Sequence, residues 1–211
     1  MTQIVLATNN AGKRKELCQM LDPHGAGIDV LGLDAFPARG PLSETGATFE
    51  ANALEKARAV AAATGYIAVA DDSGLEVDAL EGAPGVYSAR YSGPEADDER
   101  NNAKLLHELA GLPFEQRSAR FRCVLAVVTP DGGETTVEGV WDGYITESPA
   151  GSNGFGYDPL FFDPECGCTS AELPSAEKNR RSHRGKALRT LAAQWEQLIF
   201  ATGSAAQSRE P

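Results

Sequence analysis

The chain of 211 residues is long enough for one large domain or for two lobes that share a core. Its 42% hydrophobic and 23% charged residues exclude the disordered and collagen-like classes of protein. Thirty acidic against 19 basic side chains give a formal net charge of −11, so the field of the whole protein opposes non-specific attraction to nucleic acid or to an anionic membrane.

Strands and helices alternate in the first half of the chain. The apolar run Ile4–Ala7 predicts a strand, which breaks at the polar segment Thr8–Gly12 before a predicted helix over Lys13–Leu21. Thr45–Thr64 is rich in Ala, Glu, Lys and Leu and is followed by glycine, which predicts a long helix. Tyr66–Ala70 then predicts a buried strand.

The second half adds a hairpin. A helix is predicted over Glu95–Ala110, and two β-rich runs, Arg120–Val128 and Glu134–Trp141, flank the turn residues Pro130–Gly133. A short strand at Leu160–Phe162 precedes a long final helix. One face of that helix carries Leu188, Leu191, Ala192, Trp195, Leu198 and Ile199. We therefore predict an α/β protein with a mixed sheet flanked by helices.

The sequence shows no internal repeat, and we predict one domain over residues 1–200 and a flexible tail over residues 201–211. The longest apolar stretches, such as Val124–Val128, are far shorter than the ~18 residues that span a bilayer. Met1–Ala7 has no basic region followed by a long apolar run. The chain is therefore predicted to be cytoplasmic.

A polar loop, Thr8-Asn-Asn-Ala-Gly-Lys13, separates the first predicted strand from the first helix. Backbone N–H groups at a helix amino terminus, together with a lysine, can bind phosphate oxygens. The spacing differs from that of a P-loop, and turns with Asn and Gly commonly connect a strand to a helix without binding a ligand. Both interpretations remain open for the loop by itself.

Five acidic residues and no basic ones lie within Asp71–Glu81, directly after the predicted strand. Open α/β sheets bind ligands at the carboxyl ends of their strands. Asp71 and Asp72 could there bind Mg²⁺, which takes oxygen ligands from one or two carboxylates, phosphates and water. The alternative is a solvated tight turn at Asp-Asp-Ser-Gly.

Six of the 19 basic residues fall within Lys178–Arg189, a run that contains no acid. On one continuous helix, Lys178, Arg181 and Arg184 lie three residues apart, so they would share a face that could bind a polyanion. The alternative is the polar face of an amphipathic helix, with His183 as a surface histidine.

Glycines flank two aromatic residues in Asn153-Gly-Phe-Gly-Tyr-Asp-Pro159. Phe155 and Tyr157 could stack on a flat heterocycle while nearby N–H groups read its edge, although aromatic residues in loops also fill cores. With the other three segments, the chain offers a metal site, a cationic clamp and a base platform. That combination indicates a nucleoside triphosphate ligand.

The four cysteines, Cys18, Cys123, Cys166 and Cys168, are too few and too unevenly spaced for a disulfide framework. Cys166-Gly-Cys168 lacks the two-residue spacer of zinc and thioredoxin motifs. The pattern favours ordinary reduced thiols over a metal or redox site.

Six short motifs cover nearly the whole chain, from Ile4 to Leu198. They are Thr8-Asn-Asn-x-Gly-Lys13, Glu44-Thr-Gly-x-Thr-Phe-Glu-x-Asn52-Ala-x-x-Lys56-Ala57, Ala70-Asp-Asp-Ser-Gly-Leu75, Gly85-Val-Tyr-Ser-Ala-Arg-Tyr91, Gly154-Phe-Gly-Tyr-Asp-Pro159 and Lys178…Ser182-His-Arg184. In type and order they closely resemble the motifs of the inosine triphosphate pyrophosphatase family.

The resemblance implies an enzyme that removes non-standard purine nucleotides from the nucleotide pool. It implies hydrolysis of ITP, dITP and XTP to the monophosphate and pyrophosphate, by Mg²⁺-assisted attack of water on the α-phosphorus. It also implies a two-lobed α/β fold with a long mixed sheet, substrate in the cleft between the lobes, and a homodimer that has neither a nucleic acid polymer nor a membrane as partner.

Carried over by motif, the resemblance assigns Asp72 and Glu44 as Mg²⁺ ligands and Asp72 as the catalytic proton acceptor for the attacking water. The sequence leaves open whether Asp71 shares that task, because a carboxylate bound to Mg²⁺ is a weak base. The residues expected to bind substrate are Thr8, Asn9, Asn10, Ala11, Gly12, Lys13, Asn52, Lys56, Ser73, Phe155, Gly156, Tyr157, Asp158, Lys178, His183 and Arg184.

Two other functions remain compatible with the residues. The same fold could cleave modified pyrimidine triphosphates, or the chain could be a regulatory module that binds a purine nucleotide without turnover. The acidic pair argues against a module without catalysis.

Overall fold

The computed structural model describes residues 2–21, 28–37, 42–95 and 97–206. Seven strands in this part of the chain form one sheet in the order β2-β1-β3-β4-β5-β6-β7. The strands are β1 (Thr2–Leu6), β2 (Ile28–Leu31), β3 (Ile67–Val77), β4 (Ser118–Val128), β5 (Glu134–Ile145), β6 (Phe161–Asp163) and β7 (Cys168–Thr169). Strand β1 pairs parallel with β2 and β3, whereas β6 pairs antiparallel with β5 and β7. The predicted mixed sheet is confirmed.

Five α-helices accompany these strands in the described residues. They are α1 (Ala11–Leu21), α2 (Phe49–Thr64), α3 (Asp98–Glu108), α4 (Ser175–Arg181) and α5 (His183–Ala206). No described helix is long and apolar enough to span a membrane. The helices expected near the start, middle and end of the chain are all present, and the structure adds the short strands β2 and β7, which the sequence did not reveal.

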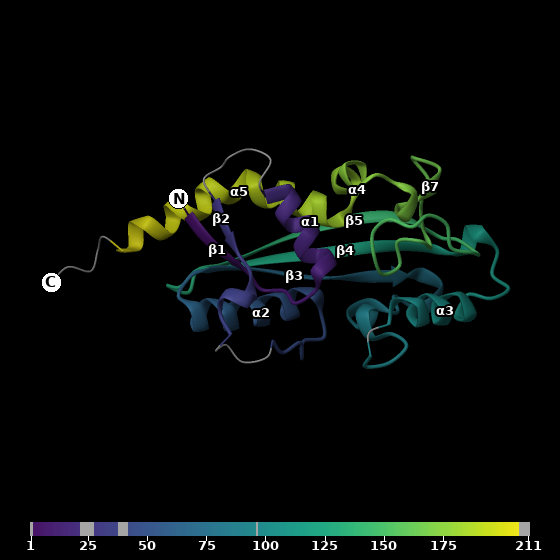
Figure 1. The fold of residues 1–211 in the computed structure, drawn as a ribbon, viewed down its shortest axis with the longest axis horizontal. Coiled ribbons are helices and arrows are strands. Elements are labelled where there is room, and N and C mark those ends of the chain that lie inside the picture. Colours follow the sequence, from purple (N-terminus) through teal and green to yellow (C-terminus); the bar gives the residue numbers. More distant parts are fainter. Residues whose placement is uncertain (1, 22–27, 38–41, 96, 207–211) are drawn as a thin grey trace. The chain divides into compact units, whose positions relative to one another are not determined.

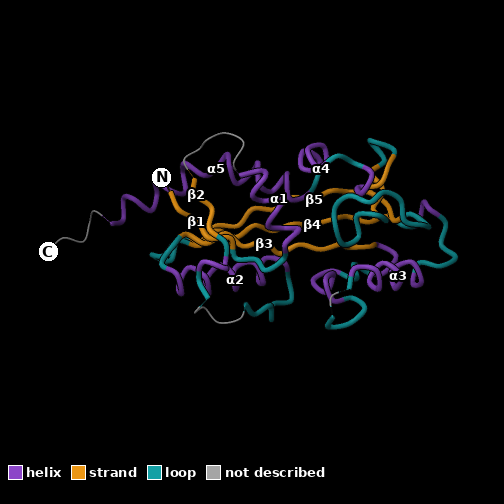
Figure 2. The backbone as a smooth tube through the Cα atoms, in the orientation of Figure 1, coloured by secondary structure: helices purple, strands orange, loops and turns teal. Residues whose placement is uncertain are grey.

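The chain divides into two compact units. The first comprises Met1–Asp72, Val124–Glu138 and Lys186–Pro211, and the second comprises Ser73–Cys123 and Gly139–Gly185. Within the first unit, α2 lies on one face of β1 and β3, and α1 and α5 lie on the other (Figure 1). Within the second, α3 and α4 lie on opposite sides of the strands (Figure 2). The assignment of residues 1–200 to one domain stays a prediction.

Helix α2 begins at Phe49, four residues after the predicted start. The Thr48 side chain caps the helix by accepting a hydrogen bond from the Ala51 N–H at 3.1 Å. The residues before the cap fold back on the helix, because the Gly46 N–H donates to Asn52 Oδ1 at 2.8 Å. Gly65 ends the helix in the left-handed conformation, with φ of 71°, as its position after Thr64 predicted.

The predicted strand Tyr66–Ala70 is too short, because β3 continues through Asp71 and Asp72 to Val77. The alternative of a tight turn at Asp-Asp-Ser-Gly is therefore wrong as well. Strand β1 pairs with β3 only as far as Val69. Beyond that point β3 still has β4 as its other neighbour in the sheet, so its backbone remains in a ladder. The acidic pair therefore lies within a strand, beside the carboxyl end of its neighbour β1.

The prediction of one continuous helix through the basic run is also wrong. Ser182 adopts an extended conformation and separates α4 from α5. Lys178 and Arg181 therefore belong to a different helix from Arg184.

Helix α5 extends to Ala206, six residues into the segment that the sequence assigned to a tail, and residues 207–211 lie outside the described residues. On its predicted apolar face Leu188 and Leu191 are buried, Trp195 is half-buried and Ala192 is exposed. The side chains of Leu198 and Ile199 lie outside the described part of the chain.

Candidate functional site

Helix α2 presents Asn52 and Lys56 to the acidic pair of β3. The two residues are four positions apart, so they lie on one helix face, and both are buried. Asn52 Nδ2 donates to Asp72 Oδ2 at 3.2 Å, and Lys56 Nζ donates to Asp72 Oδ1 at 2.9 Å. The shared face predicted from the spacing is confirmed, and it is directed at Asp72.

The Lys56 ammonium bridges two carboxylates. Its Nζ donates to Glu44 Oε1 at 2.6 Å, to Asp72 Oδ1 at 2.9 Å and to the main-chain oxygen of Asp71 at 2.9 Å. These bonds use all three donors of a lysine. The segment that carries Glu44 is held by Glu55, which accepts a hydrogen bond from the Thr45 N–H at 2.9 Å. The Lys56 ammonium therefore binds both Glu44 and Asp72, the two predicted Mg²⁺ ligands.

This donor set suits a hard divalent cation that is bound together with a phosphate. Mg²⁺ commonly takes one or two protein carboxylates and completes its shell with phosphate oxygens and water. The Glu44 side chain is 35% exposed, so both can reach it. Within the described ranges no group of three or more His, Cys, Asp or Glu residues could hold a metal ion. Two carboxylates leave most positions around such a cation for phosphate oxygens and water.

Asp71 and Asp72 point to opposite faces of the sheet, because successive residues of a strand alternate. Asp72 faces α2, whereas the buried Asp71 accepts a salt bridge from Lys13 of α1, with Lys13 Nζ 2.7 Å from Asp71 Oδ1. Helices α1 and α2 lie on opposite faces in Figure 1. The strand thereby gives the two neighbouring carboxylates different partners.

Burial raises the pKa of Asp72 above the ordinary aspartate value, although the nearby Lys56 and Lys13 ammonium groups oppose the rise. Burial also acts to lower the pKa of Lys56, but the attraction of Asp72 and Glu44 outweighs it, and the pKa of Lys56 is raised. The cluster thus combines a firmly protonated lysine with an aspartate that is a stronger base than a solvated one.

The predicted phosphate loop is held by its own side chains. The Asn10 N–H donates to Thr8 Oγ1 at 3.2 Å, and the Lys13 N–H donates to Asn10 Oδ1 at 2.9 Å. The Thr8 N–H donates to the Leu6 oxygen at 3.0 Å. The N–H groups of Thr8, Asn10 and Lys13 are therefore already engaged by protein oxygens.

A second polar cluster, in the second unit, is centred on Asp158. This buried carboxylate accepts hydrogen bonds from the Phe155 N–H at 2.8 Å and from Ser170 Oγ at 2.9 Å, and it pairs with Lys178 Nζ at 2.5 Å. Lys178 Nζ also lies 4.9 Å from the centre of the Phe155 ring. Asp158 therefore positions both the aromatic ring and the cation beside it.

Arg184 joins the same cluster from α5. Its Cζ lies 5.8 Å from the centre of the Phe155 ring, and its Nη2 donates to Ser73 Oγ at 2.8 Å. Gly154 is necessary here, because a Cβ at this position would lie 2.0 Å from Asp158 Oδ2, and its φ of 79° disfavours other residues. The structure thus brings together Ser73, Phe155, Asp158, Lys178 and Arg184.

The second aromatic residue of the glycine-rich motif does not form a platform. Tyr157 is buried in the core of its unit, and its hydroxyl donates to the Ser88 oxygen at 2.9 Å. His183 is also buried and stacks on Phe121, with ring centres 4.8 Å apart. The interpretation of His183 as a surface histidine is therefore wrong, and Phe155 is the ring of the motif that remains next to the cations.

Several residues of these clusters carried no signal in the sequence. Ser170 holds Asp158, and Gly156 is bound from α3, where Asp98 Oδ2 accepts its N–H at 2.7 Å and Asn102 Nδ2 donates to its oxygen at 3.0 Å. Each partner lies at least twelve residues away in the chain, so no local pattern could have indicated it.

The sequence-predicted site residues thus fall into two groups, one in each unit. The first contains Thr8, Asn9, Asn10, Ala11, Gly12, Lys13, Glu44, Asn52, Lys56 and Asp72, and the second contains Ser73, Phe155, Gly156, Tyr157, Asp158, Lys178, His183 and Arg184.

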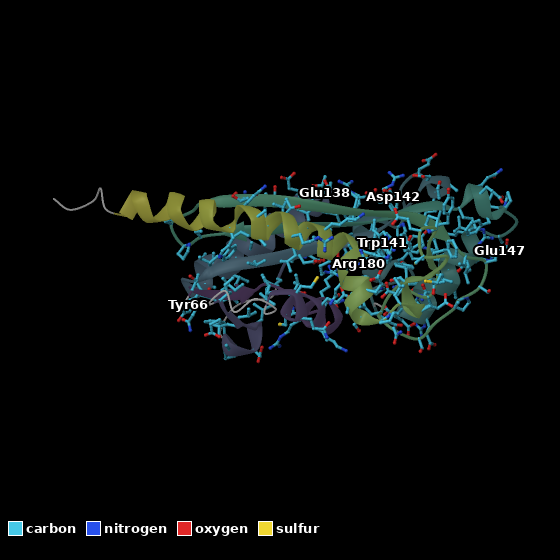
Figure 3. All side chains as sticks on the ribbon, turned by 90° about the horizontal axis from the view of Figure 1, so that it is seen from above. Tyr66, Glu138, Trp141, Asp142, Glu147 and Arg180 are labelled. Atoms are coloured by element: carbon cyan, nitrogen blue, oxygen red, sulfur yellow. The ribbon has the colours of Figure 1, made fainter. Side chains whose placement is uncertain are left out.

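The other basic residues of α4 pair with acids. Arg180 Nη2 lies 2.5 Å from Glu177 Oε1. Arg181 contacts Glu177 at 2.6 Å, Glu165 at 3.0 Å and the buried Asp163 at 3.1 Å. Asp163 also accepts a hydrogen bond from the indole N–H of Trp141 on β5. Figure 3 labels Trp141 and Arg180. Arg181 therefore holds a buried carboxylate, Arg180 forms a surface ion pair, and only part of the basic run belongs to the Asp158 cluster.

Exchanging Arg181 for glutamine should lower the free energy of unfolding by about 2 kcal/mol, because the buried Asp163 carboxylate would lose its charge partner. Arg180→Gln is the matched control and should change it by less than ~0.5 kcal/mol, since the Arg180 side chain is 65% exposed. Urea unfolding of both variants measures the difference. Equal destabilisation would contradict the structural role of Arg181.

Comparison with known proteins places these residues in a family. Residues 4–194 match the model of the Ham1 family. The chain is 64% identical over 198 residues to the dITP/XTP pyrophosphatase of Nitratidesulfovibrio vulgaris, covering 91% of this chain and 95% of that protein. It is 54% identical over 191 residues to the dITP/XTP pyrophosphatase of Geobacter sulfurreducens, covering 90% and 95%. The solved structure of a HAM1 protein from Coxiella burnetii is 42% identical, with a TM-score of 0.84 over 93% of this chain and 100% of that one.

Proposed function

The chain belongs to the Ham1 family, and we propose that it hydrolyses non-standard purine nucleoside triphosphates, namely dITP, XTP and ITP, to the monophosphate and pyrophosphate. Relatives with the name dITP/XTP pyrophosphatase align over nearly their whole length, and the sequence motifs predicted the same activity. The structural observation that supports it most directly is the pair of carboxylates, Asp72 and Glu44, bridged by Lys56.

We assign Mg²⁺ to Asp72 and Glu44. When bound, the cation supplies neutralisation of the negative charge on the triphosphate and on the departing pyrophosphate. Lys13 and Lys56 supply further positive charge in the first unit, and Asp71 holds the Lys13 ammonium in place. The triphosphate is therefore assigned to this group of residues.

Asp72 is assigned as the proton acceptor. Water attacks the α-phosphorus, the bond from that phosphorus to the bridging oxygen of pyrophosphate breaks, and the water proton passes to a carboxylate oxygen of Asp72. Asn52 and Lys56 each bind one oxygen of Asp72 and fix its orientation. Asp71 is the weaker candidate because its side chain is engaged by Lys13 on the other face of the sheet.

The purine is assigned to the cluster of Phe155, Lys178 and Arg184. Phe155 offers a ring for stacking, and the two cations offer N–H donors that suit a 6-keto oxygen. Adenine presents an amino donor at that position, so a donor would face a donor. The loss of about 1–3 kcal/mol per unsatisfied buried group corresponds to ~10- to 100-fold discrimination against ATP.

The homodimer and the cytoplasmic location that the sequence suggested stay predictions. Sedimentation of the purified chain at several concentrations measures the oligomeric state directly.

Product analysis tests the proposed reaction. The protein is incubated with dITP, XTP, ITP, GTP, ATP and modified pyrimidine triphosphates, with and without Mg²⁺, and both products are identified. We expect pyrophosphate with dIMP, XMP or IMP, and turnover only with the metal. Orthophosphate with a nucleoside diphosphate would contradict the assigned bond cleavage, and binding without turnover would support a regulatory module.

Hydrolysis in ¹⁸O-labelled water identifies the atom that water attacks. Label in the monophosphate indicates attack at the α-phosphorus, as proposed. Label in pyrophosphate would place the attack at the β-phosphorus and would contradict the mechanism.

A further inference from the structure

The turn between β6 and β7 brings two thiols into contact. Cys166 and Cys168 are separated by Gly167, whose φ of 68° lies in the left-handed region that favours glycine. Their Sγ atoms are 3.1 Å apart, and both residues are partly exposed. The pair is therefore already adjacent, at the edge of the apolar core of its unit.

The two remaining cysteines of the chain provide a contrast. Cys123 is fully buried in β4, and Cys18 lies on α1 with the same intermediate exposure as Cys166 and Cys168. Among the described residues, Cys166 and Cys168 are the two cysteines whose thiols hydrogen-bond to each other.

We propose that Cys166 and Cys168 form a dithiol that a small-molecule disulfide oxidises reversibly to an intrachain disulfide. The thiolate of one cysteine attacks the small disulfide, forms a mixed disulfide and releases one small thiol. The second cysteine then attacks the cysteine sulfur of the mixed disulfide, so the intrachain bond forms and the second small thiol leaves. Two electrons pass from the protein to the small disulfide, and the two cysteine protons end on the two released thiols or in solvent.

The structure indicates the order of attack. Burial, with the contact to Cys168, raises the pKa of the Cys166 thiol to about 12, so Cys166 is a poor nucleophile toward a solute at neutral pH. Cys168 is therefore assigned the first attack. Cys166 then reacts within the chain, where its proximity replaces a bimolecular encounter.

Oxidation of Cys166 and Cys168 should change the contacts of Asp158. Closing the bond shortens the Sγ–Sγ separation from 3.1 Å to about 2.0 Å, which moves the turn that leads into β7. The residues directly after Cys168 hold Asp158, since Ser170 Oγ donates to its carboxylate at 2.9 Å and the Ala171 N–H donates to its main-chain oxygen at 3.1 Å. Asp158 in turn binds Lys178. The chemical step stands by itself, whereas this consequence rests on the proposed function.

Mass spectrometry tests the chemical step independently of activity. The full-length protein is equilibrated with glutathione and glutathione disulfide, quenched in acid, and mapped by peptide. We expect loss of two hydrogens confined to the peptide with Cys166 and Cys168, reversed by dithiothreitol and retained in the control Cys18→Ser. Cys166→Ser should instead accumulate glutathione on Cys168. Absence of oxidation in buffers that oxidise a free dithiol, or a stable glutathione adduct on the unaltered chain, would overturn the proposal.

Kinetics test the link to Asp158. The oxidised protein should show a KM for dITP that is raised several-fold with little change in kcat, and the Cys168→Ser variant should not respond to the redox buffer. An unchanged KM in protein shown by mass to be fully oxidised would overturn the link. If the reduced protein hydrolyses none of the nucleotides, the proposed function fails while the mass result remains valid.

Discussion

Replacement of Asp72 by asparagine is expected to lower kcat for dITP and XTP by ~100-fold or more, which is the size of effect that loss of a general base produces. Asparagine keeps the shape of the side chain but neither accepts the water proton nor supplies a charged ligand to Mg²⁺. The Lys56 ammonium retains Glu44 and the main-chain oxygen of Asp71, so we expect the protein to stay folded. Steady-state kinetics with a circular dichroism melt measure both quantities.

Asp71→Asn is the matched control, because it makes the same change one residue away on the opposite face of β3. It removes the charge partner of Lys13 and should raise KM for the triphosphate more than it lowers kcat. Full activity in Asp72→Asn, or an equal loss of kcat in both variants, would contradict the assignment of Asp72 as the base.

Replacement of Lys56 by methionine should both inactivate the protein and destabilise it by about 3–5 kcal/mol, the range found when one partner of a buried ion pair is removed. The side chains of Lys56 and Asp72 are only 5% and 9% exposed. Methionine preserves the approximate length of the side chain, so the loss of stability reports the contribution of the charge. Urea unfolding without divalent cations measures that loss.

The same variant tests the proposed metal ligands. Without the ammonium, Asp72 and Glu44 repel each other, and Mg²⁺ should relieve that repulsion. Millimolar Mg²⁺ is therefore expected to raise the melting temperature of Lys56→Met more than that of the unaltered chain. An equal or absent response would contradict a cation site at these two carboxylates.

The raised pKa of Lys56 adds a dependence on pH. Its protonated form stabilises the folded state, so this contribution is complete below the ordinary value of 10.5 and is lost as the pH rises through the higher folded-state value. Lys56→Met lacks the contribution. The difference in stability between the two proteins should therefore shrink above pH 10.5, and a difference that stays constant would argue against the ion pair.

Features that depend on neighbours in the sequence could be predicted from it. The four-residue spacing of Asn52 and Lys56 gives one helix face, and a glycine after Thr64 ends the helix. The motifs also identified the family. Each of these features follows from the helical repeat or from the conformational preference of a single residue. Both are properties of the local sequence and do not depend on tertiary contacts.

The tertiary structure decided which partners these residues meet. Asp71 and Asp72 look equivalent in the sequence, but β4 extends β3 past the end of β1, and the alternation of the strand then gives one carboxylate to Lys13 and the other to Lys56. Likewise, six clustered basic residues looked alike, yet α4 ends before Ser182, Arg181 pairs with Asp163, and Lys178 pairs with Asp158. Such pairings depend on contacts between segments far apart in the chain, and no local pattern encodes those contacts.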